Sequence, residues 1–174
     1  FGFNVSDGIG PLLPKKPVDS VVICHGHLDH CGSVPELWNV QKKKPKIFGT
    51  QATKDLAELV LYDSLKVGKL KGKPRNFGRN DIRNVLHNWT MVNYKKPFTI
   101  GSTKVTFYDA GHIPGSAMAL IEMSGKKILY TSDFKIEDTQ LVQGADYKLK
   151  NIDLLIMETT YSSRSLDKRS KIEK

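Results

Sequence analysis

The stretch "VVICHGHLDHCG", residues 21–32, holds three of the five histidines in the chain. His25, His27 and His30 lie close together with Asp29, directly behind an apolar run. Imidazole and carboxylate groups together are typical ligands of zinc and similar divalent ions. In an extended or loop segment His25 and His27 point to the same side, because side chains alternate. The pattern therefore predicts a metal site at this turn.

The number of donors indicates two ions rather than one. A single catalytic zinc keeps an open position, so four ligands from one stretch are too many for it. They divide more naturally into His25 and His27 on one ion, and Asp29 and His30 on a second. The competing interpretation is a polar loop or a set of surface histidines, and it fits poorly with so dense a cluster behind an apolar strand.

Further ligands must come from other parts of the chain, where His87 and His112 are the remaining histidines. His87 lies in "NVLHNW", without acidic or glycine-rich context, and we interpret it as a helix-surface or packing residue. His112 ends "YDAGH" and enters a glycine-rich loop, where the backbone can approach a ligand closely. Asp133 closes "ILYTSDF" in a similar way, and one carboxylate can bridge two cations about 3.5–4 Å apart.

The apolar pattern around these residues predicts an α/β layered domain. The expected strands are residues 19–24, 46–50, 90–94, 98–101, 104–112, 117–123, 127–134 and a last buried strand at 151–161. The expected helices are residues 33–40, 50–67 and 80–89. The polar candidates follow the ends of several strands, so we expect them to meet at one edge of a sheet.

Local signals set some of these boundaries. Ser33 and Glu36 have the spacing of a capping box, and Asn80 is expected to cap the helix that follows it. Ser124 and Gly125 are expected to form the turn of a β-hairpin.

The chain carries 27 basic and 18 acidic residues, a net charge of +9 that favours a polyanionic partner, nucleic acid above all. Much of the excess lies in "QKKKPK" (41–46) and "KVGKLKGKPRNFGR" (66–79), and the glycines of the second run predict a mobile loop. The alternative is a solvated lysine-rich surface. No apolar run approaches a membrane span, and Cys24 and Cys31 fit reduced thiols in a cytoplasmic protein.

"CHGHLDH" resembles the H-x-H-x-D-H signature of the metallo-β-lactamase fold, and the resemblance extends from about residue 18 to residue 161. "AGHIPGSAM", "YTSDF" and "ETTYSSR" resemble the corresponding motifs of the β-CASP nucleases, particularly those of the cleavage-and-polyadenylation-factor type. The implied fold is part of an αββα sandwich of mixed sheets with flanking helices. Glu158 falls at the acidic position of motif A, where RNA-cleaving members usually carry Glu. The implied substrate is therefore single-stranded RNA.

The resemblance also implies roles for individual residues. His25, His27 and His112 would hold a first zinc, Asp29 and His30 a second, and Asp133 both. Asp29 would in addition orient the attacking hydroxide, and the two ions would activate it for phosphodiester hydrolysis. Glu158 would support a histidine that protonates the leaving oxygen.

The sequence departs from the family pattern in several places. No histidine follows His112, so the histidine that Glu158 would support and a further metal ligand are missing. Asp7 is a weak substitute for an aspartate expected upstream. We expect residues 1–174 to be the N-terminal part of a metallo-β-lactamase domain, with the β-CASP domain and the C-terminal remainder outside this chain. Cys24 stands where Thr is commoner and is expected to point into the core, and Ser132 stands where Gly is often found.

Three functions compete on this sequence. The leading one is a zinc-dependent ribonuclease in RNA processing or decay, acting as an endonuclease, a 5′–3′ exonuclease or both, alone, as a homo-oligomer or in a processing complex. The second is a small-molecule thioester, ester or amide hydrolase of the same fold, which the basic excess and "ETTY" disfavour. The third is a non-catalytic RNA-binding scaffold, which the intact set of ligands disfavours.

Overall fold

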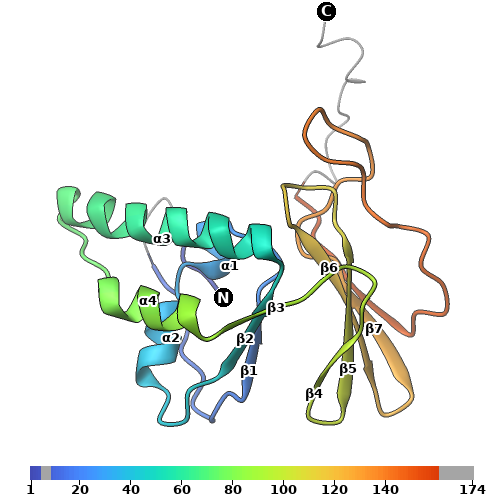
Figure 1. Ribbon diagram of the computed structural model, residues 1–174, viewed down its shortest axis with the longest axis horizontal. Coiled ribbons are helices and arrows are strands. Elements are labelled where there is room, and N and C mark those ends of the chain that lie inside the picture. Colours follow the sequence, from blue (N-terminus) through green and yellow to red (C-terminus); the bar gives the residue numbers. More distant parts are fainter. Residues whose placement is uncertain (5–8, 161–174) are drawn as a thin grey trace, which may run out of the picture.

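The computed structural model describes residues 1–4 and 9–160, so Asp7 and Tyr161 lie outside the described residues. Two sheets stand side by side, with the helices gathered on one side of the pair (Figure 1). The strands are β1 (Ser20–Val22), β2 (Lys46–Gly49), β3 (Trp89–Met91), β4 (Phe98–Ile100), β5 (Thr103–Asp109), β6 (Ala117–Met123), β7 (Lys126–Tyr130) and β8 (Leu154–Ile156). The helices are α1 (Leu28–Cys31), α2 (Val34–Val40), α3 (Gln51–Leu70) and α4 (Arg79–His87).

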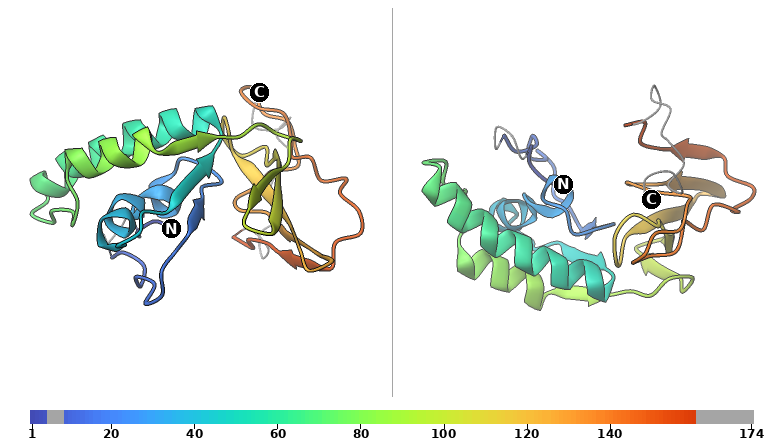
Figure 2. Two further views of the ribbon diagram at one scale, coloured as in Figure 1. Left: turned by 60° about the horizontal axis from the view of Figure 1, so that its bottom comes forward. Right: turned by 90° about the horizontal axis from the view of Figure 1, so that it is seen from above.

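The first sheet, sheet A, contains β1, β2 and β3 in that order, all parallel. Parallel neighbours need a crossover between them, and helices supply it here, as expected for an α/β layer. α2, α3 and α4 lie on one side of this sheet (Figure 2). Their apolar side chains form one core cluster with the sheet, in which Ile47, Leu61 and Ile82 are almost completely buried.

The second sheet, sheet B, has the order β4-β5-β6-β7-β8 and is antiparallel except for the last pair. The predicted hairpin between β6 and β7 is confirmed, because Met123 pairs with Lys126 across a two-residue turn. Ser124 and Gly125 have φ values of 50° and 74°. Positive φ at both central residues is the geometry of a type I′ turn, whose twist matches that of the strands.

A layer of apolar side chains joins the two sheets. Phe48 of sheet A packs with Phe107, Ala117 and Ala119 of sheet B, and Cys24 lies in the same cluster. The expected fold, mixed sheets with flanking helices as in part of an αββα sandwich, is confirmed. The outer face of sheet B is covered by the irregular segment that follows β7, and no helix covers it within the described residues.

Three local predictions need correction. The helix predicted at 50–67 extends to Leu70, because Lys69 and Leu70 are good helix formers and one glycine does not end the helix. Ser33 begins α2 but its side chain makes no capping bond; Glu36 instead accepts a hydrogen bond from Asn76 at 2.9 Å. α4 begins behind Gly78, whose N–H donates to Asp81 at 2.7 Å, rather than behind Asn80.

The last predicted strand is also partly wrong. β8 forms, but it is short and lies at the edge of sheet B. Leu154, Leu155 and Ile156 are each about half exposed, at 51%, 51% and 48%. The apolar run correctly indicated a strand, whereas its burial needs a neighbour that the described part of the chain does not place there. Within residues 1–4 and 9–160, no helix is long and apolar enough to cross a membrane.

Candidate metal centre

The histidine-rich turn leaves β1 in an extended conformation and enters the one-turn helix α1. His27 is the N-cap of α1, with φ −72° and ψ 150°, so Asp29 and His30 follow in the first helical turn. Gly26 separates His25 from His27 and lies against α3, where a Cβ would meet the Leu56 Cβ at 2.7 Å. The glycine therefore lets the histidine pair approach α3 closely.

His112 comes from the loop between β5 and β6, which two glycines and a buried serine shape. Gly111 and Gly115 have φ values of 65° and 82°, a region that favours glycine. Ser116 is fully buried, and its Oγ accepts the backbone N–H groups of His112 at 3.1 Å and Ile113 at 3.2 Å. These bonds fix the backbone that carries the His112 ring.

Asp133 follows β7 and points between the histidines of both loops. Its Oδ2 lies 3.7 Å from His25 Nε2 and 3.6 Å from His112 Nε2, while its Oδ1 lies 3.3 Å from His30 Nε2. One carboxylate thus faces residues that the sequence assigned to two different ions. This arrangement is compatible with the bridging role predicted for Asp133.

Four of the predicted ligands form a compact group: one atom each from His25, His27, His112 and Asp133, all within 4.8 Å of one another. His112 Nε2 lies 3.2 Å from His27 Nδ1. Ligands about 2.0–2.1 Å from a tetrahedral zinc are roughly 3.3 Å apart, so the shortest of these separations already match such a site. The donor set, three imidazoles and a carboxylate, also suits zinc.

The second predicted set is more open. His30 Nε2 lies between Asp29 Oδ2, at 3.6 Å, and Asp133 Oδ1, at 3.3 Å. The side chain of Asp29 is 55% exposed and does not belong to the compact group of four. The structure therefore brings all six predicted ligands to one place, with a compact half and an open half.

Burial favours the neutral, cation-binding form of His25, His30 and His112. The His25 side chain is fully buried, which lowers its pKa to about 2, with the other histidines adding to the effect. Burial also lowers the pKa values of His30 and His112, although Asp133 opposes this. The Nε2 atom of His25 makes no hydrogen bond within the described residues. A buried polar atom without a partner is costly, and a metal ion at this point would satisfy it.

Ser132 is a site residue that sequence reasoning did not assign. It is buried, has φ 53°, and its Oγ lies 3.2 Å from His25 Nδ1. With Nδ1 donating its proton to Ser132, Nε2 carries a lone pair that a metal ion can accept, on the side that faces Asp133. The available signal was the Ser at a position often occupied by Gly, but only the fold brings it beside His25.

Glu158 lies two residues beyond β8, partly exposed. Its Oε2 accepts the Thr160 N–H at 3.0 Å, and hydrogen bonding from Thr160 keeps the pKa of Glu158 below its ordinary value. Its charge reaches His112 and opposes the lowering of that pKa by burial. Glu158 is not among the four residues of the compact group, and its catalytic role stays a prediction.

Two other residues stand apart from the cluster. Cys24 points into the core between the sheets, as predicted, and burial raises the pKa of its thiol to about 12. Cys24 does not belong to the compact group of possible ligands, and its thiol packs in the core. His87 is the last residue of α4 and is exposed, in agreement with its interpretation as a surface histidine.

The family follows from a match over most of the chain. Residues 12–160 match the metallo-beta-lactamase superfamily domain. The chain belongs to this superfamily. Its compact His and Asp group lies at the motifs on which the resemblance rested, so metal dependence agrees with both fold and donors.

Two relatives have names that contain RNase, and a third is named as a cleavage and polyadenylation specificity factor. The chain is 34% identical to "Probable RNase MJ4" of Methanocaldococcus jannaschii, over 94% of this chain and 39% of the relative. It is 37% identical to "RNase J-like protein" of the same organism, over 93% and 36%. It is 34% identical to "Cleavage and polyadenylation specificity factor subunit 3" of Dictyostelium discoideum, over 97% and 22%. These matches confirm the predicted resemblance to nucleases of the cleavage-and-polyadenylation-factor type, and the chain spans two fifths or less of each relative.

Proposed function

We propose that this protein is a ribonuclease that hydrolyses phosphodiester bonds of single-stranded RNA with the help of two zinc ions. We place its action in RNA processing or decay, in the cytoplasm, either as a homo-oligomer or within a processing complex. We further propose that the chain is the N-terminal part of its metallo-β-lactamase domain. The names of the relatives, the basic excess and Glu158 support RNA as the substrate.

The observation that carries this proposal is the convergence of His25, His27, His112 and Asp133 around an unpartnered buried nitrogen. Three separate loops deliver these four residues. A cation accounts for this set, because His25 is fully buried with an unbonded Nε2, and a bound ion would offset the desolvation cost of that atom. His25, His27, His112 and Asp133 would hold the first ion, and Asp29, His30 and Asp133 the second.

Bound zinc would lower the pKa of a water molecule to about 7 and would neutralise charge on the phosphoryl oxygens. The residues of the chain orient the reactants around it. Asp29 is the most exposed carboxylate of the cluster, and it can accept a hydrogen bond from the attacking water and so direct it toward the phosphorus. The Asp29 side chain is 55% exposed, so the side of the cluster formed by Asp29 and His30 is open to substrate.

Cleavage assays on the full-length protein test the proposal. The substrates are end-labelled single-stranded RNA and DNA of the same sequence, each with zinc and with a chelator. We expect cutting of RNA only, lost with the chelator and lost in Asp29→Ala. Asp63→Ala is the matched control, since Asp63 is an exposed carboxylate on α3, outside the site.

Product lengths would separate endonuclease from exonuclease action. RNA that is bound but not cut, by a protein shown to hold two zinc ions, would overturn the proposal in favour of a scaffold. Hydrolysis of a thioester without RNA cleavage would overturn it in favour of a small-molecule hydrolase.

A further inference from the structure

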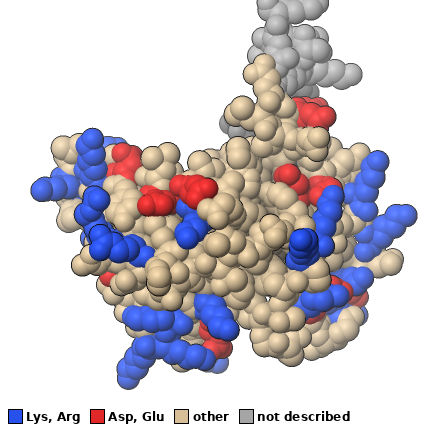
Figure 3. Space-filling model, in the orientation of Figure 1, with Lys and Arg blue, Asp and Glu red and all other residues tan. Residues whose placement is uncertain are grey.

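The turn that joins α3 to α4, residues 66–79, carries a concentrated positive charge that the metal centre does not use. This basic turn holds six lysine and arginine residues and no acidic residue. Lysine and arginine side chains gather at this end of the molecule, where α3 ends (Figure 3). Because α3 and α4 are themselves the helices that cover sheet A, the basic turn lies at the edge of a helix layer that is already in place.

The backbone of the basic turn forms a hydrogen-bonded helix end rather than the mobile loop predicted from its glycines. The Lys73 N–H donates to the Gly68 carbonyl at 2.8 Å, and the Gly72 N–H donates to the Lys69 carbonyl at 3.2 Å. Gly72 has φ 64°, the left-handed conformation that this pair of bonds requires. This Schellman motif fixes the backbone from which the lysine side chains project.

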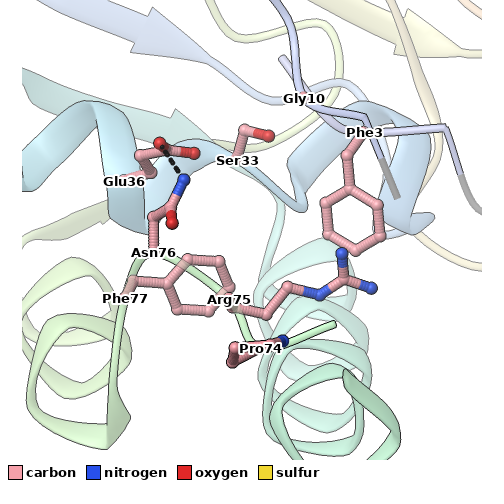
Figure 4. Close-up of a pocket in the computed structure, with 8 residues that line it drawn as sticks. All are labelled: Phe3, Gly10, Ser33, Glu36, Pro74, Arg75, Asn76 and Phe77. Carbon is pink, nitrogen blue, oxygen red and sulfur yellow. Dashed lines mark hydrogen bonds between the residues drawn. The ribbon is translucent and has the colours of Figure 1, made fainter. Parts of the chain in front are cut away.

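The connector behind this motif, residues 74–77, is held against the rest of the domain (Figure 4). Arg75 Cζ lies 3.7 Å from the centre of the Phe3 ring. The Asn76 side-chain amide donates to Glu36 Oε1 at 2.9 Å. The basic turn is therefore preformed, and a ligand that binds it does not have to order it first.

The lysines of the basic turn differ in their contacts from those of the other basic run, residues 41–46. In that run Lys43 pairs with Asp19 at 3.0 Å, and Lys44 Nζ donates to two backbone carbonyls at 2.8 and 3.1 Å. Three lysines of the basic turn are instead exposed and have no ion pair within the described part of the chain, namely Lys66, Lys69 and Lys71. Their ammonium groups can therefore donate to an external anion.

A helix dipole gives an alternative explanation for lysines at this place, because positive charge is favourable near the C-terminus of a helix. Only Lys69 lies in the last turn of α3. The basic run begins before that turn, at Lys66, and continues beyond the helix to Arg79. The dipole therefore explains only part of the charge.

The basic turn offers positive charge with little open aromatic surface. Phe77 is 8% exposed, and Arg79 Cζ covers one face of the Tyr62 ring at 4.7 Å from its centre. Bases of a single strand bind by stacking on open rings, whereas lysine side chains contact phosphates. The chemistry of this surface therefore fits the phosphate backbone of a nucleic acid rather than its bases.

The basic turn lies along α3 from the metal centre. Gly26, between His25 and His27, packs against α3 at Ala57, whose backbone nitrogen would be 3.1 Å from a Cβ at that glycine. At 1.5 Å per residue, Lys71 lies about 21 Å further along the helix axis than Ala57. A nucleic-acid strand rises about 3.4 Å per nucleotide, so this distance corresponds to about six nucleotides.

We propose that the basic turn holds the phosphate backbone of the RNA strand about six nucleotides from the metal centre. Lys66, Lys69 and Lys71 supply the contacts, which do not depend on the base sequence. The inference rests on the proposed ribonuclease function and deepens it with a length requirement. RNA that is long enough to reach the basic turn binds more tightly than RNA that reaches the metal centre alone.

RNA binding by the full-length, zinc-loaded protein tests the basic turn separately from catalysis. All proteins carry Asp29→Ala so that the RNA stays uncut, and fluorescence anisotropy measures the affinity for a labelled 12-nucleotide RNA and for a trinucleotide at several salt concentrations. The test variant combines Lys66→Gln, Lys69→Gln and Lys71→Gln. The control variant combines Lys42→Gln, Lys43→Gln and Lys46→Gln, so both lose three positive charges. Glutamine and lysine have similar helix propensities, so α3 should be kept.

The salt dependence of binding gives the expected result. Each phosphate contact with a single strand contributes about 0.7 to the slope of log affinity against log salt, so the test variant should lose about 2 from the slope. At 0.1 M salt the same loss corresponds to about hundredfold weaker binding of the 12-nucleotide RNA. We expect the control variant to keep the wild-type slope, and the trinucleotide to bind all three proteins equally.

Three results would overturn the inference. The first is an equal loss in the control variant, because net charge alone would then explain it. The second is an equal loss for the trinucleotide, since the metal centre itself would then have changed. The third is wild-type affinity of the test variant for the 12-nucleotide RNA together with lost binding of a polyglutamate peptide, which would assign the basic turn to an acidic protein.

Two further measurements keep the test decisive. Where urea denaturation shows that the test variant is destabilised, Lys71→Gln alone should still lower the slope by about 0.7, since Lys71 lies outside the helix. An unchanged slope in this single variant would count against the inference. RNA that is bound through the basic turn but left uncut by the protein with Asp29 intact would instead overturn only the ribonuclease proposal.

Discussion

The two halves of the metal centre are built in opposite ways. The turn at α1 supplies His25, His27, Asp29 and His30 from one short stretch, held by local backbone bonds such as the His30 N–H to the His27 carbonyl at 3.0 Å. Sheet B supplies only His112 and Asp133, from two loops that other parts of the chain must position. One half depends on local sequence, and the other depends on how the two sheets are placed relative to each other.

The contacts between the two halves show what fixes that placement. The Gly115 carbonyl accepts bonds from Thr50 Oγ1 and Thr53 Oγ1 at 2.8 Å each, so the first turn of α3 fastens the His112 loop. Ser132 next to Asp133 contacts His25 in the other half. Removing the ligand shared by both halves should therefore have the largest effect on the site. Removing one contact between the halves should have a smaller effect.

The shared ligand should have the largest effect. Zinc in four-ligand structural sites binds with about 10–16 kcal/mol, so losing one ligand costs roughly 3–4 kcal/mol. Asp133 contacts histidines assigned to both ions. Asp133→Ala should therefore lower the affinity for both zinc ions by several hundredfold. Zinc content after dialysis against graded concentrations of a chelator measures this. Asp55→Ala on α3 is the control. Loss of one ion with the other held at wild-type affinity would show that Asp133 is not shared.

The contact that holds the His112 loop against α3 should have the next largest effect. A Cβ at Gly115 would meet Thr50 Oγ1 at 2.6 Å, and the residue has φ 82°. Left-handed backbone costs a side chain about 1–2 kcal/mol, and overpacking about 1–3 kcal/mol more. Gly115→Ala should lower the free energy of unfolding by about 3 kcal/mol in urea denaturation.

Gly101 offers a matched control for the cost of the left-handed backbone alone, because it has φ 59° and open space where a Cβ would stand. Gly101→Ala should cost only about 1–2 kcal/mol. Equal costs at the two positions would mean that the His112 loop is not pressed against α3.

Ser132 should show two effects of opposite sign. Replacing it by Gly relieves the strain of φ 53° but removes the partner of His25 Nδ1. Ser132→Gly should leave stability unchanged or raise it by up to about 1 kcal/mol, while zinc affinity falls about tenfold. Ser124→Gly is the control, since Ser124 has φ 50° in an exposed turn without a histidine partner. A fall in stability that accounts for the lost zinc would assign Ser132 a structural role only.

The same contrast explains which features could be predicted from the sequence. The α1 turn was predicted as a metal site because its donors are adjacent, and the hairpin at Ser124 and Gly125 because its turn chemistry is local. His112 and Asp133 were predicted from glycine-rich loops at strand ends together with the family resemblance. The contact of Ser132 with His25 could not be predicted, since it joins residues that only the folded sheets bring together.

Cap positions and burial were harder to predict for related reasons. Ser33 has the spacing of a capping box, yet Glu36 bonds to Asn76 in a connector whose path the sequence did not indicate. The run at 151–161 is apolar enough for a core strand, but burial is a property of neighbours as well as of composition. β8 has a neighbour on one side only among the described residues.

Leu129 and Leu155 turn that point into a prediction, and Leu155→Ala has the smallest expected effect on stability. They are partners in register on β7 and β8, and yet Leu129 is 8% exposed and Leu155 51%. Leu129→Ala should lower the free energy of unfolding of this 174-residue chain by about 2–3 kcal/mol, as expected for a buried leucine. Leu155→Ala should cost less than about 1 kcal/mol, because much of that side chain is already in water. Equal costs would mean that β8 is covered in solution, and a dependence of the Leu155→Ala cost on protein concentration would identify a second copy of the chain as the cover. The difference between the two leucines therefore measures how far an apolar pattern alone can be read as burial.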